Sequence, residues 1–247
     1  MTGRAGVVAA RPMYPADEHP RLKVDTSMGS FVVELFSEDM PVTCANVIAL
    51  AREGFYNGTH VHRVVPNFGV QFGCPFSKFG PRHPSVGRGG PEAHSTFPLN
   101  DGSGAVVTRD KCGNIRDEWT AAFSNEPFTV CMANAGAPNT NGSQLFVNLA
   151  KNVFLDWFNP TLPASHLVIG LVVEGVSTLR AIEAVAVRDE DGHAPVAPIL
   201  VRRVEVVDPD PSVRLRALQA RQRAAASPTA ARPASPGISP AEPPASL

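Results

Sequence analysis

Two stretches of the chain carry side chains suited to recognising another polypeptide. In the first, residues 61–73, Arg63 and Gln71 stand eight positions apart on sequence that favours β-strand. Period-2 alternation sends both side chains to the same face if no bulge intervenes. An isolated arginine of this kind is more often a surface residue in a salt bridge, so its chemistry depends on what lies beside it.

The second stretch, residues 132–147, is small and polar in its middle and apolar at both ends. Residues 129–131 and 145–147 are typical of strands, and the residues between them contain strong turn signals. This shelf supplies uncharged amides and hydroxyls, from Asn134, Asn139, Asn141, Ser143 and Gln144. Such groups suit a peptide backbone rather than phosphate or metal. The alternative is an ordered loop whose amides cap its own turns.

Together the two stretches closely resemble the cyclophilins, a family of peptidyl-prolyl cis/trans isomerases built on a closed β-barrel. The resemblance runs from about residue 22 to residue 207. It implies an all-β fold, a closed antiparallel barrel of about eight strands capped by two α-helices. It also implies an enzyme that rotates X-Pro peptide bonds in proteins, assists folding, and needs neither cofactor nor metal.

Rotation about a peptide bond faces a barrier of about 18–20 kcal/mol, because the C–N bond has partial double-bond character. A catalyst must favour the twisted bond, in which the prolyl nitrogen regains its lone pair, over either planar form. A rate gain of about 10⁵ needs roughly 7 kcal/mol of such stabilisation. Arg63 fits this role, since its planar fork is always charged and can also hold the substrate carbonyl.

The resemblance assigns an apolar pocket for the proline ring. The side chains that match it are Phe68, Phe146, Phe154 and Leu155. Ordinary core packing is the alternative for each, because it is the usual fate of Phe and Leu. His166 matches the histidine at the rim of the family's pocket, although a histidine before an apolar strand is more often structural.

Four further residues match the positions that hold the substrate backbone in cyclophilins. They are Gln71, Ala133, Asn134 and Gln144. Asn134 would pair with the peptide through its main chain, and Gln71 would also support Arg63.

The chain departs from the family pattern around this site. Gly69 stands where cyclophilins usually carry a methionine, and Phe154 stands where many carry the tryptophan that hydrogen-bonds cyclosporin. We therefore expect cyclosporin to bind more weakly than usual. The shelf has an extra Ala137, and residues 157–165 lengthen the segment beside the expected groove, which could narrow or extend substrate selection.

Hydrophobic patterning predicts the elements that position these residues. Residues 22–36 alternate as two strands around a turn, and 166–172 and 198–207 also indicate strands. A helix is predicted from Pro41 to a left-handed cap at Gly54, and a second over 175–184. Residues 76–123 are rich in glycine and irregular, and we interpret them as a long surface insertion.

The chain divides into four parts on composition. Residues 1–20 form an irregular lead-in, 21–207 the cyclophilin-like domain, 208–226 a weakly amphipathic helix or a solvated appendage, and 227–247 a disordered Pro/Ala/Ser-rich tail. Arg4 and Arg11, with no acid before Asp17, leave a mitochondrial transit peptide as an alternative to our expectation of a cytoplasmic protein.

Charge and cysteine usage exclude several other classes. A formal net charge of −1 gives no electrostatic case for nucleic acid or a membrane surface, and no apolar run is long enough for a membrane helix. Four widely spaced cysteines argue against zinc and disulfide scaffolds. His60 and His62 could lie on one face of a strand as metal ligands, but no nearby Cys or acid completes a set.

The sequence signatures of two other kinds of functional site are missing. The glycine clusters contain no phosphate-binding loop motif, and no nucleophile signature indicates a Ser-His-Asp hydrolase. The hypothesis that competes with an isomerase is a cyclophilin-like binding or structural subunit of a larger assembly. In that case the insertions and tails would make the contacts, and the barrel would have weak or no activity.

Overall fold

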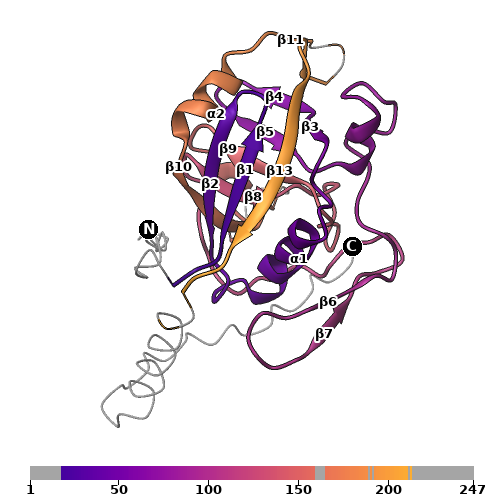
Figure 1. The fold of residues 1–247 in the computed structure, drawn as a ribbon, viewed down its shortest axis with the longest axis vertical. Helices are drawn as coiled ribbons and strands as arrows, with labels where there is room; N and C mark the ends of the chain where they lie inside the picture. The colour runs from indigo at the N-terminus through magenta and orange to yellow at the C-terminus, as the bar shows by residue number, and fades with distance from the viewer. Residues whose placement is uncertain (1–17, 159–164, 189, 191, 211, 213–247) are drawn as a thin grey trace, which may run out of the picture. The chain divides into compact units, whose positions relative to one another are not determined.

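The computed structural model describes residues 18–158, 165–188, 190, 192–210 and 212. The chain divides into two units, residues 1–209 and 210–247, and the elements named here lie in the first. Its main sheet has nine antiparallel strands in the order β3-β13-β1-β2-β10-β8-β9-β5-β4 (Figure 1). Their bounds are β1 Arg21–Thr26, β2 Gly29–Leu35, β3 Thr59–Val61, β4 Arg63–Val65, β5 Gly69–Phe72, β8 Thr129–Met132, β9 Leu145–Asn148, β10 Val168–Glu174 and β13 Ile199–Val207.

The barrel closes at His62. Strand β3 pairs with β13 and β4 pairs with β5, while His62 alone separates β3 from β4. The two ends of the sheet are thus one chain segment interrupted at a single residue. Counted as one strand, β3 and β4 give the predicted barrel of eight strands, so the fold expected from the resemblance is confirmed.

Two helices close the core of the barrel. Helix α1 (Pro41–Arg52) and helix α2 (Val176–Glu183) both contribute to the main hydrophobic cluster, α1 through residues such as Val47 and Ile48 and α2 through Leu179 and Ile182. Gly54 follows α1 with a φ of 70°, as the predicted left-handed cap requires.

The region 76–123 is more than a surface insertion, and that interpretation is wrong in part. It begins within a 3-10 helix, η1 (Pro75–Phe79), and contains a hairpin of β6 (Thr96–Pro98) and β7 (Val106–Thr108). Phe97 and Ile115 are buried in a separate cluster with Ala45 of α1. Figure 1 shows the hairpin beside α1. The glycines mark turns between segments that pack on the barrel.

A buried arginine fastens the insertion to α1. Arg109 is 2% exposed, donates from Nε to Asn46 Oδ1 at 2.8 Å and from Nη1 to Ser95 Oγ at 2.8 Å, and lies 4.7 Å from the Phe97 ring centroid. Glu118 makes a second attachment, because its carboxylate accepts hydrogen bonds from the Val42 and Thr43 amides at the start of α1. These amides have no partner within the helix, and a carboxylate is favoured there.

Smaller elements complete the described chain: η2 (Val153–Leu155), β11 (Val187–Arg188) and β12 (Ala194–Pro195). The predicted lead-in, the helix at 208–226 and the tail fall largely outside the described residues. None of the described helices has the length and apolarity needed to cross a bilayer.

Substituting Arg109 tests the attachment of the insertion. Arg109→Ala should lower the free energy of unfolding by about 2–4 kcal/mol, because it removes two hydrogen bonds and leaves Asn46 without its buried partner. Urea unfolding of Arg116→Ala is the control, since Arg116 is exposed and a surface change of this kind costs under about 0.5 kcal/mol. Equal losses in both variants would contradict the assignment.

His62 should make stability depend on pH. Burial, partly offset by the His60 backbone and Gln144, lowers the pKa of His62 from 6.5 to about 4. Between these values the unfolded chain binds the proton and the folded chain does not, so stability is complete above pH 6.5 and is lost as the pH falls toward 4. The loss should approach about 3 kcal/mol.

Denaturant titrations across that pH range measure the effect. His62→Gln should flatten the dependence, whereas His94→Asn, a change at an exposed histidine, should leave it intact. An unchanged slope in His62→Gln would show that other groups cause it.

Candidate functional site

A single cross-strand row places the predicted site on the outer face of the barrel. Arg63 pairs with Gln71, Gln71 with Phe146, and Phe146 with Cys131, across β4, β5, β9 and β8. Directly opposed residues project to the same face of a sheet. The predicted shared face of Arg63 and Gln71 is therefore present, but the two face each other across a hairpin instead of following one strand.

The neighbouring row faces the core. Val64 pairs with Val70, Val70 with Val147, and Val147 with Val130, and all four belong to the main hydrophobic cluster. Alternation along each strand thus separates an apolar interior row from an exterior row that carries predicted site residues. The burial of the valines fixes which side chains can face a ligand.

Arg63 is half-buried beside an aromatic ring. Its guanidinium carbon lies 5.4 Å from the Phe68 ring centroid. Partial burial lowers the pKa of Arg63, but an arginine keeps its charge at neutral pH. No described residue forms a hydrogen bond or ion pair with the guanidinium. Its donors are therefore available to a ligand within the described structure.

Aromatic rings form an apolar floor next to Arg63. Phe68 stacks on Phe146 at 6.3 Å with an interplanar angle of 7°, and on Phe154 at 6.2 Å. Phe146 and Leu155 are each 5% exposed, whereas Phe154 is 45% exposed at the edge. All four side chains predicted for the proline ring are thus brought together, with Phe154 at the rim.

Sequence reasoning missed one member of this floor. Phe123 is buried in the same cluster as Phe146 and Leu155, and its ring centroid lies 4.8 Å from that of Phe36. It is the last residue of the irregular insertion, where no periodicity indicates which side chains turn inward. No local sequence pattern therefore predicts that Phe123 is buried in this cluster.

The turn that presents Phe68 is held from three sides. The Asn67 amide donates to Glu183 of α2 at 2.9 Å, and the Phe68 carbonyl accepts from the Leu149 amide and from the Asn152 side chain. Asn67 has a φ of 56°, a conformation that asparagine tolerates well. The ring therefore has a fixed place beside Arg63.

His166 closes the row of aromatic contacts. Its ring meets Phe146 edge-on at 5.1 Å, and Nδ1 lies 2.9 Å from the Met132 carbonyl, which can only accept. Burial lowers the pKa of His166, with the Met132 carbonyl opposing the shift. The neutral ring with its proton on Nδ1 leaves Nε2 as an acceptor.

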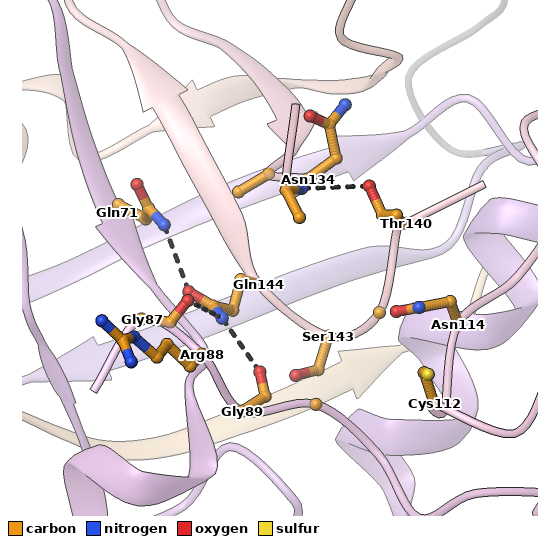
Figure 2. A pocket seen from close by; sticks show the side chains of 14 residues that line it. Gln71, Gly87, Arg88, Gly89, Cys112, Asn114, Asn134, Thr140, Ser143 and Gln144 are labelled. Carbon is orange, nitrogen blue, oxygen red and sulfur yellow. Dashed lines mark hydrogen bonds between the residues drawn. The ribbon is translucent and has the colours of Figure 1, made fainter. Parts of the chain in front are cut away.

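The two glutamines of the site hydrogen-bond to each other. Gln71 Nε2 donates to Gln144 Oε1 at 3.1 Å, and Gln144 Nε2 donates to the carbonyls of Gly87 and Gly89, each at 2.9 Å (Figure 2). The Gln144 side chain is thus engaged within the protein. It fixes Gln71, and it ties the glycine-rich segment 87–90 to the barrel.

On the shelf, the side chain of Asn134 has partners within the protein and its main chain has none among the described residues. The Asn134 side chain donates to the Ser165 carbonyl at 2.7 Å and accepts from the Gly136 amide, so it is engaged internally. No described residue hydrogen-bonds to the Asn134 main chain. Asp117 of the insertion holds the far end of the shelf, accepting from the Asn139 amide and the Asn141 side chain.

A cavity of about 430 Å³ opens between the shelf and the insertion. Its walls are Gln71, residues 87–90, Cys112, Asn114, residues 133–135, Thr140 and residues 142–144 (Figure 2). Arg88 is the only charged side chain among these lining residues. The glycines that suggested a surface insertion therefore form one wall of the site.

Gly69 has a packing reason to be glycine. An added Cβ would lie 3.0 Å from the Val147 carbonyl oxygen and 3.5 Å from a Phe146 ring carbon. A methionine, as most cyclophilins carry here, would require β9 to shift by a few tenths of an ångström. Glycine at this position thus leaves β5 and β9 closely paired.

His60 and His62, considered as metal ligands from the sequence, lie in different environments in the structure. His60 Nδ1 lies 2.7 Å from the Ser77 carbonyl, and His62 is buried at the barrel closure. Across the described ranges there is no group of three or more His, Cys, Asp or Glu able to hold a metal.

Comparison with known proteins agrees with this geometry. Residues 21–206 match the family described as cyclophilin type peptidyl-prolyl cis-trans isomerase/CLD. Peptidyl-prolyl cis-trans isomerase-like 1 of Aspergillus fumigatus is 35% identical over 185 residues, which cover 74% of this chain and 93% of the relative. Peptidyl-prolyl cis-trans isomerase CYP18-2 of Arabidopsis thaliana is 30% identical over 195 residues, or 78% and 98% of the two chains.

A solved structure shows the same fold. The cyclophilin of Cryptosporidium parvum, crystallised in the presence of the dipeptide Ala-Pro, superposes with a TM-score of 0.57 at 23% identity and covers 76% of this chain and 99% of its own. With the barrel, the exterior row and the sequence matches in agreement, the chain belongs to the cyclophilin-type peptidyl-prolyl cis-trans isomerase family.

Proposed function

We propose that this chain isomerises X-Pro bonds in polypeptides with Arg63 as the electrophile. The observation that supports this most directly is the guanidinium of Arg63, unpaired among the described residues, beside the stacked rings of Phe68 and Phe146. A cation with free donors next to an apolar floor can receive a peptide carbonyl and a proline ring together. The competing role as an inactive subunit has no comparable support from the site.

The reaction needs no covalent step. Proline would rest on Phe68, Phe146 and Leu155, with its preceding carbonyl free to rotate. As the C–N bond twists, the prolyl nitrogen becomes pyramidal and basic, and an Arg63 N–H can donate to it. Planar ground states offer this nitrogen lone pair to the carbonyl instead, so the hydrogen bond strengthens mainly in the transition state.

Other residues hold the ends of the substrate still while the bond turns. We assign backbone pairing to the Asn134 main chain, which the described residues leave free, with Ala133 beside it. Gln71 and Gln144 keep the wall next to Arg63 rigid through their mutual hydrogen bond. His166 borders the floor as a neutral acceptor. Fixed groups of this kind lower the barrier without reorganising during the reaction.

Removing the guanidinium tests the proposal. Arg63→Ala should lower kcat/KM for a short Ala-Pro peptide by about 10²–10³, the usual cost of a lost transition-state donor. Arg63→Lys should recover only part of it, because a single ammonium cannot reproduce the planar fork. Exchange NMR or a protease-coupled assay measures the rates, with Arg116→Ala as the control. Wild-type protein without activity, or full activity in Arg63→Ala, would refute the role.

Phe154 should weaken cyclosporin binding, since it lacks an indole donor. Phe154→Trp should tighten binding by up to about tenfold, the value of one hydrogen bond, while changing turnover less. Calorimetric titration of both proteins measures the affinities. Nanomolar binding by the wild type would contradict the expectation.

A further inference from the structure

We propose that a second cavity, on the other side of Gln71, binds an anionic side chain of the substrate located after the proline. This rests on the proposed isomerase function and names the class of sequence that the enzyme favours. The cavity has a volume of about 460 Å³. Its walls are His62, Arg63, Gln71, Pro81, Arg82, His83, Pro84, Val86, Gly87 and Gly192.

The charge on these walls is positive. Arg63 and Arg82 both line the cavity, and no aspartate or glutamate is among the lining residues. No described residue forms a hydrogen bond or ion pair with either guanidinium. Two unpaired arginines across one cavity repel each other, and an anion between them would relieve that repulsion. A carboxylate or phosphate also matches the planar fork of arginine.

The wall that carries Arg82 has a defined conformation. Pro81 and Pro84 flank Arg82 and His83, and each proline restricts its own φ. His83 stacks on Phe76 at 5.7 Å with an interplanar angle of 15° and accepts a hydrogen bond from the Ser85 amide. Arg82 is exposed, and the prolines and the His83 contacts restrain the backbone of the segment that presents it.

The opposite wall contains a buried polar ring. His62 is 5% exposed, and neither ring nitrogen makes a hydrogen bond of ordinary distance and angle. The His60 backbone and Gln144 interact with this ring, and an anion entering from the cavity would add a partner of ordinary geometry. His62 precedes Arg63 in the chain, and both side chains line this cavity.

The position of the cavity fixes which substrate residue reaches it. Gln71 and Gly87 line both cavities, so the two lie on either side of this shared wall. Asn134 of the shelf lines the first cavity, and we assign its main chain to the part of the substrate backbone that precedes the proline. A chain crossing the apolar floor from the shelf would then place the residues after the proline beside Arg63 and Arg82.

Exchange NMR on matched peptides tests this inference. The series Ala-Ala-Pro-Ala-X-Ala would carry Gln, Glu, Lys, Ser or phosphoserine at X, with a second series that places Glu before the proline. Glu and phosphoserine after the proline should raise kcat/KM about three- to tenfold over Gln and Ser, with the gain shrinking as salt rises. Comparing the Glu peptide with the phosphoserine peptide shows whether the cavity prefers a carboxylate or a phosphomonoester.

Variants assign the effect to the cavity. Arg82→Gln should abolish the preference, Arg82→Lys should keep part of it, and Arg116→Gln, which removes an exposed arginine elsewhere in the insertion, should leave it unchanged. Thermal unfolding confirms that each variant is folded. A preference that survives Arg82→Gln, equal rates for Glu and Gln, or a preference only before the proline would overturn the proposal.

Two further outcomes are distinguishable. A preference for Lys would also overturn the proposal, and would point to the acidic run Asp189-Glu190-Asp191 that precedes Gly192 in the sequence. If no peptide is turned over, the isomerase function fails. Fluorescence titration of the same peptides, each carrying a fluorescent label, still measures whether the cavity prefers an acidic side chain. Tighter binding of Glu over Gln, lost in Arg82→Gln, would support the cavity independently of catalysis.

Discussion

The site depends on the register between β4, β5 and β9. That register places Val64, Val70 and Val147 in the core and Arg63, Gln71 and Phe146 outside. A shift of one residue would bury the arginine and expose the valines, at a cost of several kcal/mol, because a charge and three apolar side chains would exchange environments. Burial of the valines is therefore what holds the arginine next to the aromatic floor.

The insertion, residues 76–123, restrains a second set of positions: Gln144, the shelf and the start of α1. Its glycine carbonyls hold Gln144, its Asp117 holds the shelf, and its Glu118 holds the start of α1. The Glu118 contact joins the irregular insertion to a helix, and the Asp117 contact joins it to the loop between β8 and β9. Segments of this kind usually vary most between relatives, so they are a natural place for substrate selection to arise while the row that carries Arg63 stays unchanged.

Much of the barrel and most of the candidate site followed from sequence. Alternating strands, the proline at the start of α1 and Gly54 at its end are local signals, and the two motif stretches carried the resemblance. Two features of the site could not be predicted from short-range sequence patterns. The pairing of Arg63 with Gln71 required knowing that residues 66–68 turn, and Phe123, Arg109 and the wall at 87–90 acquire their roles from contacts distant in sequence.

The most direct test of the central claim is a crystal structure of this chain with a short Ala-Pro peptide bound. The account predicts the proline ring against Phe68, Phe146 and Leu155, with the Arg63 guanidinium facing the prolyl nitrogen. A peptide bound elsewhere on the barrel, or an Arg63 side chain turned away from it and paired with the protein's own carboxylate, would contradict the account.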